Sequence, residues 1–214
     1  MTDVSVRSRF ERFPATVKGA MVFRGEDADP HQVAIREARV VGVPGEPARA
    51  LPIERATVTV PPHQDVFVPF EMGIADLPPG WYGFEIDVDL DGSPRTLHGD
   101  RRFTIPWPRG SMRTGTVRVD RDVRVGSVAI RVERVQLASD STSVRFVVTP
   151  PVDAEVVVDL ADGRGSLPML SVAVEPATGQ GTATGYPLAR SEHDLRVSFL
   201  ADDGSRADLD IALE

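Results

Sequence analysis

Hydrophobic and polar residues alternate along most of this 214-residue chain. Alternation with a period of two is typical of a β-strand that buries one of its faces. The clearest case is the segment 81–90, where Phe84, Ile86, Val88 and Leu90 fall on one face. Comparable segments recur from end to end, separated by turns rich in glycine, proline and aspartate. The pattern therefore predicts an all-β protein.

The first half is predicted to contain about seven strands. They are expected at residues 4–10, 17–23, 33–43, 57–60, 66–70, 81–90 and 97–105. The segment 31–41 could also form a helix by residue propensity, but we favour a strand that bends near Ala38. Seven strands in about 100 residues is the number found in an immunoglobulin-like sandwich.

The second half shows the same alternation of hydrophobic and polar residues. Strands are expected at residues 116–125, 128–137, 144–148, 156–160, 170–174, 182–186, 195–200 and 209–213. The hydrophobic phase slips between Val132 and Val135, which predicts a β-bulge near Arg134. Asp-Gly pairs at 162–163 and 203–204 predict tight turns between strands.

One proline-rich interruption, Ile105-Pro106-Trp107-Pro108-Arg109-Gly110, divides the chain. We therefore expect two tandem immunoglobulin-like β-sandwich domains, residues 1–105 and 112–214, joined by a linker at 106–111. Each proline fixes φ, so the linker is expected to be stiff. Trp107 is expected to be partly buried against one or both domains and to set the angle between them; a simple spacer is the alternative.

Charge and composition exclude several classes of function. The formal net charge is −8, and each half contributes −4, so neither half is the basic module that nucleic-acid binding needs. The absence of cysteine excludes disulfides, thiolate metal sites and cysteine nucleophiles. No apolar signal region and no apolar stretch of ~20 residues occurs, so we expect no membrane insertion and a cytoplasmic location.

The strand predicted at 81–90 carries an acidic face. Its alternation directs Glu85, Asp87, Asp89 and Asp91 outward together, within a run from residue 56 to 94 that has seven acids and no lysine or arginine. Adjacent carboxylates repel unless they are paired or screened. A solvated face, partly paired by His98 and Arg102 on the returning strand, is one interpretation; a docking face for a basic partner is another.

Calcium is a third interpretation of this face. The spacing Asp87-x-Asp89-x-Asp91-Gly92 matches the start of an EF-hand loop. The ninth and twelfth positions of that loop are Arg95 and His98, however, and no flanking helices are predicted. We therefore assign no metal site.

Arginines concentrate next, with nine of them between residues 101 and 134 against three acids. Arg118, Arg124 and Arg131 are expected to point outward from strands whose valines and isoleucines face inward. An anion or phosphate site, a contact with the acidic strand between domains or subunits, and a solvated face all fit this pattern.

The sequence contains no recognisable catalytic motif. The four histidines are scattered, and Glu192-His193-Asp194 reads as a turn at the start of a strand. The glycine-rich run 179–185 lies between predicted strands, without the helix N-terminus that a phosphate-binding loop requires. We expect no catalytic, cofactor-binding or metal-binding residues, and no cofactor.

Residues 1–106 resemble the arrestin-like superfamily, including bacterial sporulation-control proteins of that fold. The residues that carry the resemblance are the segments Phe13–Phe23, Val68–Glu71 and Asp76–Gly83. Ala15 replaces the glycine of that family's turn, and the second half shows no comparable match. The resemblance implies a non-enzymatic adaptor made of two sandwiches, and it supplies no site residues.

The sequence thus predicts a non-enzymatic protein that acts by protein–protein contact as an adaptor, scaffold or assembly subunit, through a protein partner or self-association. The expected interaction surface comprises Glu85, Asp87, Asp89, Asp91, Arg118, Arg124, Arg131 and Trp107. A carbohydrate-binding or small-molecule-binding module is the alternative, although few aromatic residues besides the phenylalanines are available to it.

Overall fold

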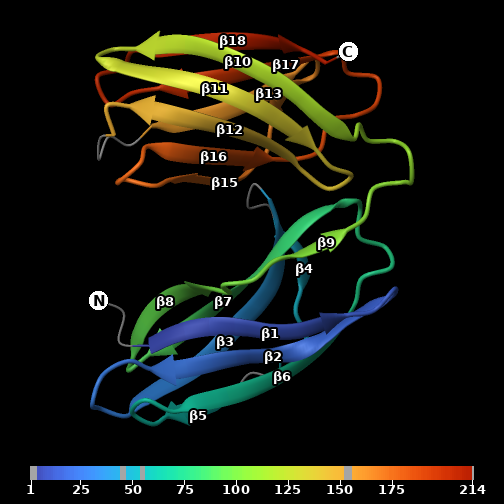
Figure 1. The fold of residues 1–214 in the computed structure, drawn as a ribbon. Helices are drawn as coiled ribbons and strands as arrows, with labels where there is room; N and C mark the ends of the chain where they lie inside the picture. The colour runs from blue at the N-terminus through green and yellow to red at the C-terminus, as the bar shows by residue number, and fades with distance from the viewer. Residues whose placement is uncertain (1–3, 44–46, 54–55, 152–155, 214) are drawn as a thin grey trace. The chain divides into compact units, whose positions relative to one another are not determined.

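The computed structural model describes residues 4–43, 47–53, 56–151 and 156–213. These residues form β-strands and no helix, so the predicted fold class, all-β with tandem immunoglobulin-like sandwiches, is confirmed. The chain divides into two compact units, Met1–Ile105 and Pro106–Glu214. Figure 1 shows the strands of each unit arranged in two layers.

The described residues of the first unit form nine strands. They are β1 (Val4–Arg12), β2 (Thr16–Gly25), β3 (His31–Gly42), β4 (Pro47–Ala50), β5 (Thr57–Val60), β6 (Asp65–Gly73), β7 (Gly80–Leu90), β8 (Ser93–His98) and β9 (Phe103–Ile105). One sheet has the order β1-β2-β6, and the other has the order β4-β3-β7-β8, with β5 also paired to β3 and β9 to β7. All pairs are antiparallel.

This order matches the A-B-E and C′-C-F-G sheets of immunoglobulin-like sandwiches, with β7 in the position of strand F. A second feature agrees with the assignment. The hydroxyl of Tyr82, near the start of β7, donates a 2.7 Å hydrogen bond to the carbonyl of Pro78. That is the arrangement of a tyrosine corner, which pins the chain where it enters strand F.

The core of the first unit lies between its two sheets. Along β7, buried and half-buried residues alternate without a break, as the sequence pattern predicts. Phe84 packs within this core against Phe10, Phe70 and Phe103, with ring centroids 5.1–5.6 Å apart. Aromatic pairs at such distances add stabilisation beyond the area they bury.

Besides the unpredicted strand β4, two details of the first unit differ from the sequence interpretation. The segment at 31–41 is a strand, as favoured, but its register shifts between Ile35 and Glu37, before the expected bend at Ala38. The return strand expected at 97–105 is divided into β8, which follows the Asp91-Gly92 turn directly, and β9. The segment between them is held by Ser8, whose buried hydroxyl accepts a hydrogen bond from Arg101 N at 3.1 Å.

Nine strands also occur in the part of the second unit that the structure describes. They are β10 (Gly115–Val125), β11 (Val128–Leu137), β12 (Thr142–Thr149), β13 (Val157–Asp162), β14 (Gly165–Leu167), β15 (Met169–Val174), β16 (Gln180–Gly185), β17 (Asp194–Leu200) and β18 (Arg206–Ala212). The sheets have the orders β10-β11-β12-β16-β15 and β14-β13-β17-β18. Without β10 these are the A-B-E-D and C′-C-F-G orders of an immunoglobulin-like domain, so β10 is an added strand on the edge of strand A.

The bulge predicted near Arg134 is confirmed by a register shift between Val132 and Arg134 where β11 pairs with β12. A second irregularity, between Arg118 and Arg121, was not predicted. Asp120 lies in it with φ of 48°, in the left-handed region that most non-glycine residues avoid.

The segment expected to be a linker, residues 106–111, is packed onto the second unit. Trp107 makes an edge-to-face contact with Tyr186, with ring centroids 5.4 Å apart. Arg190 N donates to the carbonyl of Ser111 at 2.8 Å, and Met112 forms an antiparallel bridge with Ala189. The segment is therefore an integral part of this unit instead of a free spacer.

The glycine-rich run has a packing role. Gly181 on β16 lies directly opposite Phe146 on β12, whose ring covers it. A Cβ at position 181 would lie 2.2 Å from Phe146 Cε2, and a Cβ at Gly179 would lie 2.2 Å from the carbonyl oxygen of Val148. The glycines are present because neighbouring atoms occupy the side-chain volume.

Candidate interaction surfaces

The acidic strand is β7, and its three central carboxylates face outward together, as predicted. Glu85, Asp87 and Asp89 are half-buried, with side-chain exposures of 18%, 31% and 21%. Arg39 on β3 lies between two of them. Its Nε donates to Glu85 Oε2 at 3.0 Å, and its Nη1 donates to Asp87 Oδ2 at 2.5 Å.

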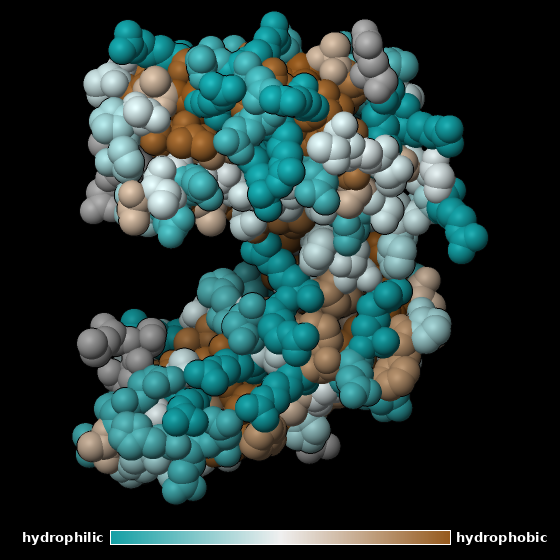
Figure 2. All heavy atoms as spheres, in the orientation of Figure 1, coloured by the Kyte–Doolittle hydropathy of each residue, from teal (hydrophilic) through white to brown (hydrophobic). Residues whose placement is uncertain are grey.

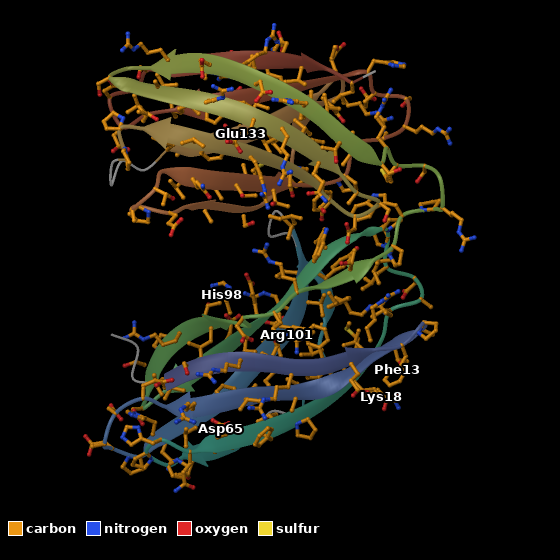
Figure 3. The ribbon with its side chains drawn as sticks, in the orientation of Figure 1. Phe13, Lys18, Asp65, His98, Arg101 and Glu133 are labelled. Carbon is orange, nitrogen blue, oxygen red and sulfur yellow. The ribbon has the colours of Figure 1, made fainter. Side chains whose placement is uncertain are left out.

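Further partners contact the carboxylates of this face. Arg36 on β3 forms an ion pair with Asp89. From β8, the hydroxyl of Thr96 donates to Asp87 Oδ1 at 2.6 Å, and His98, labelled in Figure 3, lies 3.3 Å from Glu85. Hydrogen bonds from Arg39 and then Thr96 lower the pKa of Asp87. The acids that sequence reasoning placed on an open face are thus largely matched by arginines from a strand about 50 residues earlier.

Asp91, the fourth acid, lies outside the strand. It forms the turn from β7 to β8 with Gly92, and both residues have positive φ, 51° and 83°. This is the geometry of a type I′ hairpin turn, which Asp-Gly pairs favour. The carboxylate of Asp91 faces the first residue of β3, with Oδ1 accepting from Gln32 N at 2.8 Å and Oδ2 lying 2.6 Å from His31 Nδ1.

These positions do not form an EF-hand. Asp87 and Asp89 lie on a paired strand and engage arginine, while Asp91 engages His31. Among the described residues, no group of three or more histidine, aspartate or glutamate side chains could hold a metal ion.

A different surface carries uncompensated charge: the outer face of the sheet that contains β10, β11 and β12. Arg118 on β10 lies directly opposite Arg134 on β11, and Arg134 lies directly opposite Arg145 on β12. All three side chains are exposed. Directly opposite Cβ atoms in antiparallel strands lie about 4.5–5.5 Å apart, so three guanidinium groups form a row across three strands.

We call Arg118, Arg134 and Arg145 the arginine row. Asp120 compensates one end of it, because its carboxylate forms ion pairs with both Arg118 and Arg131. Across the described residues, no ion pair reaches Arg134 or Arg145. Glu133, which occupies the β11 bulge beside Arg134 and is labelled in Figure 3, is exposed.

The predicted arginines therefore have different surroundings. Arg118, Arg124 and Arg131 are all exposed, as expected. Arg124 lies opposite Ala129 and Arg131 lies opposite Asp122, so neither faces another arginine. Sequence reasoning missed Arg145, and it counted Arg134 in the arginine-rich run and at the bulge but not on the interaction surface. The strand register that aligns them depends on two bulges, and only one of these has a clear hydrophobic signature.

The sheet face around the arginine row is polar. Residues beside it on β12 and β16 include Ser143 and Thr184, which share a 3.1 Å hydrogen bond, and Thr182 directly opposite Arg145. Figure 2 shows hydrophilic side chains gathered over β10 and β11 on the side turned to the viewer. Guanidinium groups on a polar face bind carboxylates or phosphates through charge-assisted hydrogen bonds.

Three of the four histidines make contacts with charged side chains. His31 is 6% exposed and lies between Asp27 and Asp91. His193 Nδ1 lies 3.0 Å from Arg113 Nη2, and His98 lies beside Glu85. In the part of the chain that the structure describes, no helix is long and apolar enough to span a membrane.

Comparisons with known proteins give only weak structural similarities. No protein-family model matches the chain, and no curated protein matches it. Among solved structures, it is similar to a conserved domain protein from Bacillus anthracis, with 12% identity, a TM-score of 0.40, and coverage of 100% of this chain and 88% of that one. It is also similar to red sea bream transglutaminase, with 12% identity and a TM-score of 0.35 over 100% of this chain and 32% of that one. These similarities identify no family.

Proposed function

We propose that this protein is a non-enzymatic interaction protein that binds an acidic protein partner through the arginine row. The single observation that carries the proposal is that Arg134 and Arg145 lie directly opposite each other with no carboxylate partner among the described residues. Like charges directly opposite in a sheet destabilise it. A carboxylate supplied by a partner would relieve that repulsion, so binding would be coupled to a stability gain.

The acidic strand is less suited to partner binding. Its carboxylates already receive hydrogen bonds from Arg39 and Arg36, and a basic partner would have to displace those arginines. Asp87 and Asp89 are therefore expected to contribute to folding more than to docking. A partner with clustered carboxylates, bound to the second unit, is the complementary match.

The resemblance of residues 1–106 to arrestin-like adaptors supports the same class of function.

The test begins with affinity capture from the source organism and identification of the captured proteins. Each candidate is then purified and its dissociation constant measured across a salt series. The double variant Arg134→Glu with Arg145→Glu is expected to weaken binding at least about tenfold and to flatten the salt dependence. Arg7→Glu is the matched control, because Arg7 is also an exposed strand arginine but lies opposite Val22.

The proposal fails if the double variant and the Arg7→Glu control both bind every captured protein with the dissociation constant of the wild type. It also fails if sedimentation shows that the chain's main interaction is with itself. In that case the partner that binds the arginine row would be a second copy of the chain.

A further inference from the structure

The second unit contains a cavity of about 690 Å³ where the 106–114 segment meets the loop before β17. The polar residues that line it include Arg109, Arg113, Thr114, Ser139 and Arg190, and the indole of Trp107 also lines it. Its volume lies within the range of small-molecule sites. None of the described residues that line it is acidic, so three guanidinium groups share one concave surface without a carboxylate.

The walls of this cavity are held in place by hydrogen bonds and ring contacts. Arg113 N donates to the carbonyl of Leu188, and Arg190 N donates to that of Ser111, each at 2.8 Å. The edge-to-face contact between Trp107 and Tyr186 orients the indole. A site whose walls are fixed before binding loses less conformational entropy when a ligand arrives.

Arg113 is oriented from two sides. Its Nη1 donates to the carbonyl of Leu213 at 2.9 Å, and its Nη2 donates to His193 Nδ1 at 3.0 Å. Neither acceptor carries a negative charge, so neither neutralises the guanidinium. A third nitrogen of this guanidinium, Nε, is buried and has no hydrogen-bond partner among the described residues. A buried donor without an acceptor costs free energy. An anion in the cavity would supply the countercharge that these contacts do not provide.

Arg109 and Arg190 are also available. Both are exposed, and no ion pair joins either of them to a carboxylate within the described parts of the chain. Guanidinium groups form paired hydrogen bonds with carboxylate and phosphate oxygens, and an indole stacks on planar rings. We propose that this cavity binds a small organic anion in which a carboxylate or phosphate is attached to a planar ring, with the anionic group on the arginines and the ring beside Trp107.

This site is separate from the arginine row, and it gives the chain a small-molecule ligand in addition to a protein partner. The probes are phenyl phosphate, benzoate and inorganic phosphate, with benzyl alcohol as the neutral analogue. The readout is the indole N–H signal of Trp107 in ¹⁵N-labelled protein, assigned with Trp107→Phe. Phenyl phosphate or benzoate is expected to shift this signal in a saturable way, and benzyl alcohol is expected to leave it unchanged.

The double variant Arg109→Gln with Arg190→Gln is expected to weaken binding of the aromatic anions at least about tenfold, measured by calorimetry. Trp107→Leu should weaken phenyl phosphate while leaving inorganic phosphate unaffected. If phenyl phosphate binds no more tightly than inorganic phosphate, the role of the indole is refuted. No saturable shift at millimolar phenyl phosphate or benzoate, or equal affinity in the arginine double variant, overturns the proposal.

A matched control separates this test from that of the proposed function. Arg134 lies outside the cavity, so the Arg134→Glu variant should bind phenyl phosphate with the affinity of the wild type. Because the two sites share no residues, failure of either test leaves the other unaffected.

Discussion

His31 Nδ1 lies 2.6 Å from Asp91 Oδ2, and this contact attaches the start of β3 to the turn between β7 and β8. The other ring nitrogen, Nε2, lies 2.8 Å from Asp27 Oδ1. Hydrogen bonds to Asp91 and then to Asp27 outweigh burial and raise the pKa of His31 to about 9. The imidazolium form, which donates to both carboxylates, is therefore the form that the fold stabilises.

This raised pKa predicts a defined dependence of stability on pH. A histidine that binds its proton more tightly in the folded state adds most to the free energy of unfolding below its unfolded pKa of 6.5. This contribution is lost as the pH rises through about 9. We expect the free energy of unfolding of the wild type to fall between those values. Urea unfolding at a series of pH values measures it.

His31→Gln is expected to lower the free energy of unfolding by about 1–2 kcal/mol near pH 6, since charge-assisted hydrogen bonds are lost while both carboxylates stay partly solvated. The difference from wild type should shrink above pH ~9. His98→Gln is the control, because His98 is exposed on the same sheet, with a side-chain exposure of 67%. A deficit in His31→Gln that stays constant up to high pH would contradict the assignment.

The arginine row makes a second prediction, about stability without any partner. Arg134→Glu should increase the free energy of unfolding by roughly 0.2–1 kcal/mol, because it replaces a like-charge pair with an opposite-charge pair across β11 and β12. Arg124→Glu should bring no gain, since Arg124 lies opposite Ala129. Thermal and urea unfolding measure both variants. Destabilisation by Arg134→Glu would mean that the guanidinium is compensated in the fold.

Gly181 and Phe146 provide a third prediction. Gly181→Ala should destabilise the protein by about 1–3 kcal/mol, because the added methyl would meet the buried ring of Phe146. Combined with Phe146→Leu, which makes room, its cost should be smaller than in the wild-type background. Gly73→Ala is the control, because a Cβ there meets nothing within 4 Å. Equal costs of Gly181→Ala in both backgrounds would show that the ring does not set the requirement for glycine.

A fourth prediction concerns the neutralised acids of β7. Arg39→Met should cost about 1–3 kcal/mol at neutral pH, because the half-buried Glu85 and Asp87 both lose a charged donor. Arg36→Met should cost about 0–1 kcal/mol, since Arg36 is 64% exposed. Urea unfolding of the two variants compares them.

The sign of the pH effect follows from Asp87. Because Arg39 lowers the pKa of that carboxyl, the stabilisation it brings is present above the ordinary value of 3.8 and is lost as the pH falls through the lowered value. The deficit of Arg39→Met should therefore shrink in acid. Equal stabilities of Arg39→Met and Arg36→Met at neutral pH would refute the central role of Arg39.

Much of the fold could be predicted from local pattern. The alternation in β7, the Asp-Gly turns and the phase slip near Arg134 each depend on residues a few positions apart. Strand β4 was missed because its four residues carry too few hydrophobic positions to alternate. The proline-rich segment was expected to be stiff with Trp107 partly buried, but its composition does not reveal the partner of that residue, Tyr186, which is 79 positions away.

By itself, the sequence determined the all-β class, the strand alternation and the exposure of Arg118, Arg124 and Arg131, because a period of two assigns each side chain to a face without reference to other strands. Only the tertiary structure decided which charges meet. Strand order and register placed Arg39 between Glu85 and Asp87, and placed Arg134 opposite Arg145. Electrostatic interaction falls with distance in space, and that distance is set by pairing between strands remote in sequence.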